Sequence, residues 1–155
     1  MPTRRPIEGR KIDPATWPRP LPFPHFTTEE STVIRRFIDE NILKGEWYFD
    51  VKLPSMKAEF VKNLPEPWAT MWKNLTAKRI DALCFTGKAW HIIEVKRQML
   101  ASGIGQLKLY DFMFKKYYQP EEPVHLWYVT FYHDPDVVLM CEREGIKTWL
   151  SLIHI

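Results

Sequence analysis

Three charged side chains fall in two neighbouring segments that have the pattern of β-strands. Asp81 lies within residues 78–85, and Glu94 and Lys96 lie within residues 89–96. Glu94 and Lys96 are two positions apart, so on a strand both side chains point to the same face. A tight turn joins the two segments. The carboxylate of Asp81 is therefore expected to lie within a few ångströms of Glu94.

These residue types predict a particular chemistry. Charged groups at the end of a buried strand cost free energy unless they bind something, and two close carboxylates repel each other unless a cation lies between them. Hard oxygen ligands without a nearby His or Cys select Mg²⁺ or Mn²⁺ over zinc. A lysine beside such a metal can orient an attacking water, lower its pKa or stabilise negative charge on a phosphate. We therefore expect Asp81 and Glu94 to bind Mg²⁺ or Mn²⁺, with Lys96 beside them.

The first helix is expected to supply a further carboxylate. Thr27-x-x-Glu30 fits a capping box, in which the hydroxyl and the carboxylate satisfy free backbone N–H groups, so the helix should begin at Thr27. Gly45 should end it. Glu30 falls near the middle of the apolar face of this helix. It is therefore either only a capping residue or also a third carboxylate at the metal site.

The rest of the body should alternate between strands and helices. We expect a strand with Trp47, Phe49, Val51 and Leu53 on one face, interrupted helical structure over 54–77, strands over 78–85 and 89–96, a loop through Ser102 and Gly103, a helix of about 14 residues ending near Tyr118, a strand over 124–132, a short helix capped by Asp134 and closed by Gly145, and a strand over 147–153. This order predicts an α/β (α+β) fold with a mixed central sheet flanked by helices.

The arrangement resembles the PD-(D/E)xK nuclease superfamily, whose core has the restriction-endonuclease-like order αβββαβ. The match is an Asp at the end of one strand, a hairpin, and Glu-x-Lys on the next strand, here Asp81 with Glu94 and Lys96. The resemblance covers roughly residues 27–132. It implies that Asp81 and Glu94 bind the metal and that Lys96 assists the nucleophilic water. Many members place a metal-site Glu on the first helix, which implies Glu30 as a third ligand.

A second motif follows on the next helix. Gln106 and Tyr110 are four residues apart, on one stripe with Met113 and Tyr117 that should face the sheet. The pair resembles the Gln-x-x-x-Tyr motif of the exonuclease branch of the superfamily, where it lines the site and contacts the DNA backbone. The alternative is a solvated Gln106 beside a Tyr110 that belongs to the core.

The resemblance implies a function. It indicates a Mg²⁺-dependent deoxyribonuclease that hydrolyses DNA phosphodiester bonds, acting on double-stranded ends as an exonuclease or an endonuclease. The small size favours a structure-selective Holliday-junction resolvase, which acts as a homodimer. A catalytically inactive nucleic-acid-binding module on the same fold is the other alternative.

The N-terminal segment differs in composition from the rest. Residues 1–24 hold seven of the 13 prolines and five basic residues against two acidic ones, which predicts an extended arm and not a helix or an interior strand. Such an arm either contacts phosphates or packs Trp17, Leu21 and Phe23 against the body. Residues 25–155 should then form a single nuclease-like domain.

The overall composition excludes several other classes. The 155 residues, 45% of them hydrophobic, fit one globular domain, and no apolar run approaches the ~18 residues of a membrane span. The N-terminus lacks the apolar stretch of a signal peptide. Two cysteines and five scattered histidines argue against a disulfide scaffold or a zinc site. We therefore expect an intracellular, cytoplasmic protein whose partner is DNA and not a membrane.

Overall fold

The computed structural model describes residues 6–16, 26–54, 61–71 and 78–151. In chain order its elements are β1 (Arg10–Ile12), the 3₁₀ helix η1 (Pro14–Thr16), α1 (Thr28–Asp39), β2 (Glu46–Leu53), the 3₁₀ helix η2 (Val61–Asn63), β3 (Lys78–Phe85), β4 (Trp90–Gln98), α4 (Ala101–Tyr118), β5 (Val124–Tyr132), α5 (Pro135–Arg143) and β6 (Ile146–Leu150). The six strands form one sheet in chain order; β1 to β4 are antiparallel neighbours, and β4 to β6 are parallel. The predicted α+β fold with a mixed sheet is confirmed at this level.

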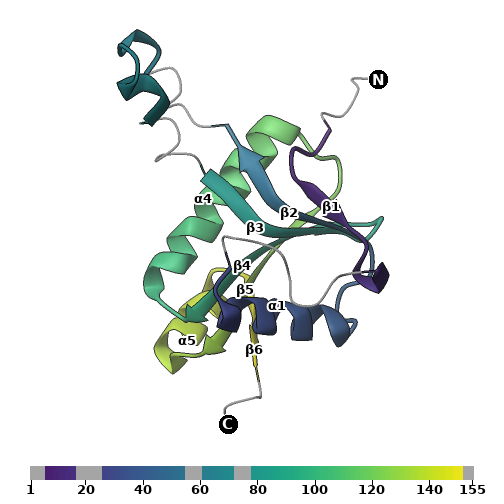
Figure 1. Ribbon diagram of the computed structural model, residues 1–155. Helices are drawn as coiled ribbons and strands as arrows, with labels where there is room; N and C mark the ends of the chain where they lie inside the picture. The colour runs from purple at the N-terminus through teal and green to yellow at the C-terminus, as the bar shows by residue number, and fades with distance from the viewer. Residues whose placement is uncertain (1–5, 17–25, 55–60, 72–77, 152–155) are drawn as a thin grey trace.

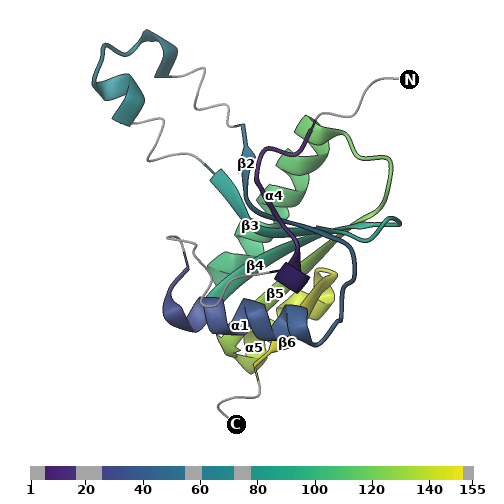
Figure 2. The same cartoon turned by 45° about the vertical axis from the view of Figure 1, so that its right-hand side comes forward.

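The sheet has helices on both faces, with α1 on one side and α4 and α5 on the other (Figures 1 and 2). Each face carries its own hydrophobic cluster. On the α1 side its members include Ile34, Phe37, Trp47, Phe49, Ile93 and Trp127. On the α4 side they include Leu53, Ile80, Ile92, Leu107, Phe114 and Tyr128. Strand β4 lies between β3 and β5 and is buried on both faces from Trp90 to Val95, which confirms its predicted central position.

The predicted single apolar face of β2 is wrong. Trp47 and Phe49 pack on the α1 side of the sheet, whereas Val51 and Leu53 pack on the α4 side. The backbone of Asp50 has φ of 51°. This positive φ interrupts the regular pleat, so the alternation of side chains changes face at this residue. All four apolar side chains are nevertheless buried.

The ends of two helices also differ from the prediction. Thr27 caps α1 as expected, but the helix ends at Asp39, and Gly45 lies beyond it. Asn41 has φ of 54°, a conformation that asparagine tolerates better than most residues and that stops the helix early. Gly45 has another role, because the backbone of Phe85 passes too close to it to leave room for a Cβ atom.

Helix α4 begins earlier than predicted. It starts at Ala101, so Ser102 and Gly103 form part of its first turn and not a loop. A Cβ atom on Gly103 would overlap the phenol of Tyr128, so the glycine lets this helix pack closely on β5. A tertiary contact therefore explains a glycine that resembles a loop signal in the sequence.

The remaining elements follow the sequence closely. Strands β3 and β5 have the predicted bounds, and Asp134 caps α5 by accepting the N–H of Asp136 at 2.9 Å. Part of the predicted arm joins the sheet, because residues 10–12 form its edge strand against β2. Trp17, Leu21, Phe23 and residues 152–153, for which the sequence made predictions, lie outside the described residues. Of the stretch 54–77 the structure describes residues 54 and 61–71, which contain η2 and a helical turn at 68–71, in agreement with interrupted helical structure.

Candidate active site

The candidate site lies where β3 and β4 separate. Their antiparallel pairing runs from Phe85 opposite Trp90 to Ala82 opposite Ile93, and one further step would place Asp81 opposite Glu94. At this step the Oδ2 atom of Asp81 accepts the backbone N–H of Val95 at 2.9 Å. The side chain of Asp81 thus binds a β4 amide where the backbone ladder stops. In Figure 1 the beginning of β3 and the end of β4 point apart.

The predicted residues Asp81, Glu94 and Lys96 come together at this fork. Glu94 is only 2% exposed, and its carboxyl group is hydrogen-bonded to that of Asp81. The Nζ atom of Lys96 lies 3.4 Å from Oε1 of Glu94, while the lysine side chain stays partly exposed. Asp81, Glu94 and Lys96 with Glu30 are called the charged cluster below.

The electrostatics of the cluster agree with two close carboxylates. Burial raises the pKa of Asp81 well above its ordinary value, and the charge of Glu94 raises it further. Burial also raises the pKa of Glu94, although the ammonium group of Lys96 opposes this. Burial lowers the pKa of Lys96, but the carboxylates of Glu94 and Asp81 outweigh that effect, so its pKa is raised. Without a cation between them the two carboxyl groups therefore tend to retain a proton.

Glu30 has the first of the two roles that the sequence left open, because it belongs to the cap of α1. Thr27 Oγ1 accepts the N–H of Glu30 at 3.1 Å, and the carboxylate of Glu30 is in turn hydrogen-bonded to the backbone of Thr27, which completes the capping box. Burial raises the pKa of Glu30, and the positive charge of Lys96 lowers it, so its carboxylate lies within electrostatic reach of Lys96. The neighbouring Glu29 pairs with Arg97 at the end of β4, which ties the beginning of α1 to this strand.

Of the two predicted DNA-contact residues, Tyr110 is the one that the structure shows beside the cluster. It is 8% exposed, and its pKa is raised by burial and by the charges of Glu94 and Asp81. Gln106 lies one turn earlier in α4 and is partly buried. Tyr110 is therefore both a core residue and a wall of the site, and Gln106 lies beyond it towards the beginning of the helix.

Sequence reasoning missed Tyr128. It lies opposite Glu94 in the parallel register of β4 and β5. Its hydroxyl group donates to the carbonyl of Leu100 and accepts the N–H of the same residue, both at 3.0 Å. These bonds fix the beginning of α4 over the site. No local pattern could reveal this contact, because it depends on the register of two strands that α4 separates in the chain.

The carboxylates of Asp81 and Glu94 suit a hard divalent cation, but they supply only part of a full set of ligands. Asp81 and Glu94 offer neighbouring carboxylate oxygens, whose pKa values are raised mainly by burial, and for Asp81 also by the charge of Glu94, an unfavourable effect that a cation would offset. Among the described residues, however, no three His, Cys, Asp or Glu side chains form a group close enough to hold a metal ion. Asp81 and Glu94 would therefore bind the ion mainly as a pair, and Glu30 would add negative charge nearby.

His91 and the two cysteines, which could also do chemistry, are packed inside the protein. His91 is 7% exposed and accepts the Trp127 indole N–H on Nδ1 at 2.9 Å, so it belongs to the core. The sequence did not suggest that its ring would lie 5.1 Å from that of His125 on β5. Both cysteines are buried, as expected.

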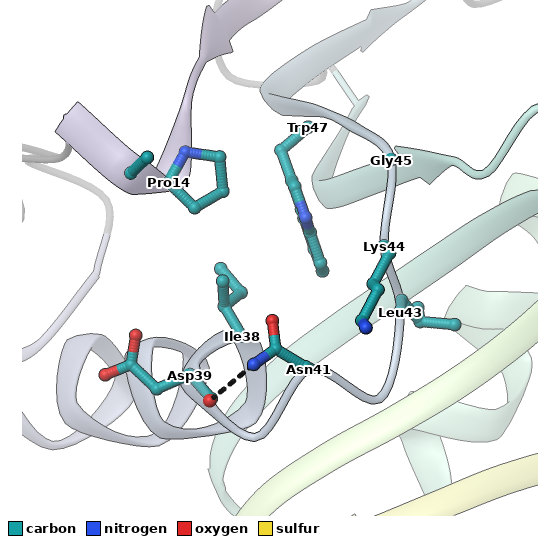
Figure 3. Close-up of a pocket in the computed structure, with 9 residues that line it drawn as sticks. Pro14, Ile38, Asp39, Asn41, Leu43, Lys44, Gly45 and Trp47 are labelled. Atoms are coloured by element: carbon teal, nitrogen blue, oxygen red, sulfur yellow. Dashed lines mark hydrogen bonds between the residues drawn. The ribbon is translucent and has the colours of Figure 1, made fainter.

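A cavity of about 350 Å³ lies elsewhere, at the end of α1 opposite to Glu30 (Figure 3). Its lining includes Pro14, Ile38, Asn41, Lys44 and Trp47. The charged cluster takes no part in that lining, so the cavity is separate from the candidate site.

The comparisons with known proteins identify no relative. No family model, no curated protein and no solved structure matches this chain. In the described part of the chain, no helix has the length and apolar character needed to cross a membrane.

Proposed function

We propose that this protein is a Mg²⁺- or Mn²⁺-dependent deoxyribonuclease that hydrolyses phosphodiester bonds near double-stranded DNA ends. The observation that carries the proposal is the meeting of Asp81, Glu94 and Lys96 at the fork between β3 and β4. The finer fold assignment belongs to the same proposal. The order α1, β2, β3, β4, α4, β5 corresponds to the αβββαβ core of the PD-(D/E)xK nucleases.

Each residue of the cluster has a distinct role in this proposal. Asp81 and Glu94 would hold the cation, which when bound supplies Lewis-acid polarisation of the phosphate and lowers the pKa of a bound water. Lys96 has a raised pKa, so at neutral pH it is an ammonium group that donates hydrogen bonds and does not act as a base. Its contribution is to stabilise the negative charge that develops on the phosphate oxygens. Tyr110 and Gln106 would contact the DNA backbone beside the cluster.

Cleavage assays with a matched variant test the proposal. Linear, nicked, circular and branched DNA are incubated with the protein in Mg²⁺, in Mn²⁺ and in EDTA. We expect the wild type to cleave open DNA only with a divalent cation, and we expect Glu94→Gln and Lys96→Met to lose at least a hundredfold in rate. Glu142→Gln removes one exposed carboxylate of α5 and should cleave like the wild type. Full activity of Glu94→Gln, or no cleavage of any DNA form by the wild type, would leave only a binding module.

A further inference from the structure

Residues 61–71, called the 61–71 tip below, expose large apolar side chains. Trp68 is 61% exposed, Met71 49% and Leu64 39%. The tip has local backbone hydrogen bonds, since the N–H groups of Ala69 and Met71 donate to carbonyl groups four residues earlier at 3.2 and 3.1 Å. The exposed indole of Trp68 is therefore not needed to fold the turn that carries it.

The tip lies on the same side of the molecule as the fork. Both views place residues 61–71 away from the layered body, beyond the end of β2 and the beginning of β3 (Figures 1 and 2). Strand β3 begins at Lys78 and reaches Asp81 three residues later. A ligand that fills the fork at Asp81 and extends outwards would thus meet the tip.

The strands beneath the tip carry unusual positive charge. Lys52 of β2 and Arg79 of β3 are exposed and stand directly opposite each other in the register. Like charges in this arrangement destabilise a sheet unless an anion compensates them. Among the described residues of the range 52–79, four are basic and one is acidic, a net charge of +3, which equals the net charge of the whole chain. This surface therefore complements a polyanion, and its apolar tip suits a ligand that offers flat apolar faces as well as phosphates.

We propose that this surface binds DNA where a base pair is exposed, at an end or a branch. Trp68 stacks on the exposed base pair, with Leu64 and Met71 beside it, and Lys52 and Arg79 bind backbone phosphates. The inference rests on the proposed nuclease function, because the fork supplies the direction from which the duplex arrives. It names the structural feature of DNA that the enzyme selects.

Binding assays in EDTA separate this inference from catalysis. Anisotropy measures the affinity for an open duplex with a 2-aminopurine base at its end and for a closed duplex whose ends are hairpin loops. We expect the wild type to prefer the open duplex and to change the 2-aminopurine fluorescence. Trp68→Ala should weaken open-duplex binding roughly tenfold and leave closed-duplex binding unchanged. Lys52→Gln should weaken both and lower the salt slope by about one.

Phe112→Ala is the matched control, since Phe112 is also 61% exposed but lies on α4. It should bind both duplexes like the wild type. Equal effects of Trp68→Ala and Phe112→Ala, or an equal loss by Trp68→Ala on open and closed duplexes, would overturn the inference. So would a change of oligomeric state in Trp68→Ala by sedimentation, which would assign the tip to a protein partner. Absent cleavage in Mg²⁺ together with an intact open-end preference would refute the nuclease alone.

Discussion

The repulsion between Asp81 and Glu94 leads to a prediction that can be tested without any substrate. In Asp81→Asn the amide oxygen can still accept the N–H of Val95, and the amide NH₂ group can donate to Glu94. The variant keeps the hydrogen bonds of the fork and loses one of the two charges. We therefore expect a protein that is more stable than the wild type in EDTA but unable to cleave DNA.

The size of the effect can be estimated from Coulomb's law. Two unit charges roughly 4 Å apart repel by about 4 kcal/mol at an effective dielectric constant of about 20. The raised pKa values show that a retained proton relieves part of this repulsion. We expect Asp81→Asn to raise the free energy of unfolding by about 1–3 kcal/mol at pH 7.

The stability difference between Asp81→Asn and the wild type should depend on pH, and linkage gives its sign. A carboxyl group whose pKa is raised in the folded state binds more protons there than in the unfolded state, so stability is highest below its unfolded pKa and is lost as the pH rises through its folded pKa. The advantage of Asp81→Asn over the wild type should therefore vanish near pH 4 and grow towards pH 8. Urea denaturation across this range measures it. Glu142→Gln, which removes an exposed charge, should follow the wild type within about 0.5 kcal/mol.

Stability in the presence of Mg²⁺ is a second test of the same repulsion. The ion should stabilise the wild type by about 2.7 kcal/mol at a hundred times its dissociation constant and should stabilise Asp81→Asn much less. If Asp81→Asn were less stable than the wild type at every pH, or gained the same stability from Mg²⁺, the two carboxylates would not be a repelling pair that awaits a cation.

Three further predictions concern the elements that position the site. Gly103→Ala should lose more than about 2 kcal/mol in urea denaturation, because the new methyl group overlaps Tyr128, whereas Gly105→Ala in the same helix meets open space and should gain about 0.5–1 kcal/mol. Tyr128→Phe should lose about 1–3 kcal/mol, because both hydrogen bonds to Leu100 disappear, and hydrogen exchange at the beginning of α4 should accelerate. His91 has its pKa lowered to about 4 by burial and by neighbouring positive groups, so its contribution to stability is complete above pH ~6.5 and is lost as the pH falls towards 4. NMR titration of His91 checks this value, and a pKa near 6.5 would contradict it.

Local sequence patterns were enough to predict most elements of the fold and the central pair of the site. Asp81 and Glu94 belong to one hairpin, so their proximity follows from a tight turn and from the two-residue repeat of strands. Strands β3 and β5 have the predicted bounds because their β-branched and aromatic residues lie between clear turn signals. Predictions that needed only neighbours along the chain were therefore mostly accurate, with the end of α1 at Asp39 as an exception.

The errors occurred where distant parts of the chain determine the structure. The beginning of α4 depends on the contact of Gly103 with Tyr128, which are 25 positions apart in the sequence. The change of face in β2 depends on the positive φ of Asp50, a conformation that Asp adopts more readily than most residues but that its presence in a strand does not predict. Tyr128 faces Glu94 only because β4 and β5 pair in one particular register. Each of these features requires the assembled sheet.

The change of face at Asp50 also accounts for the fork and for the direction of the β2–β3 pair. The paired strand β3 changes face at the same level, since Ile80 packs on the α4 side and Ala82 on the α1 side. Beyond this level β2 and β3 stay paired with each other, while β3 no longer pairs with β4. Asp81 lies between these two residues, where β3 changes face, and its carboxylate binds the amide of Val95 and lies beside Glu94. One distortion of the sheet thus opens the fork and directs the β2–β3 pair, with the basic residues and the tip that follow, away from β4.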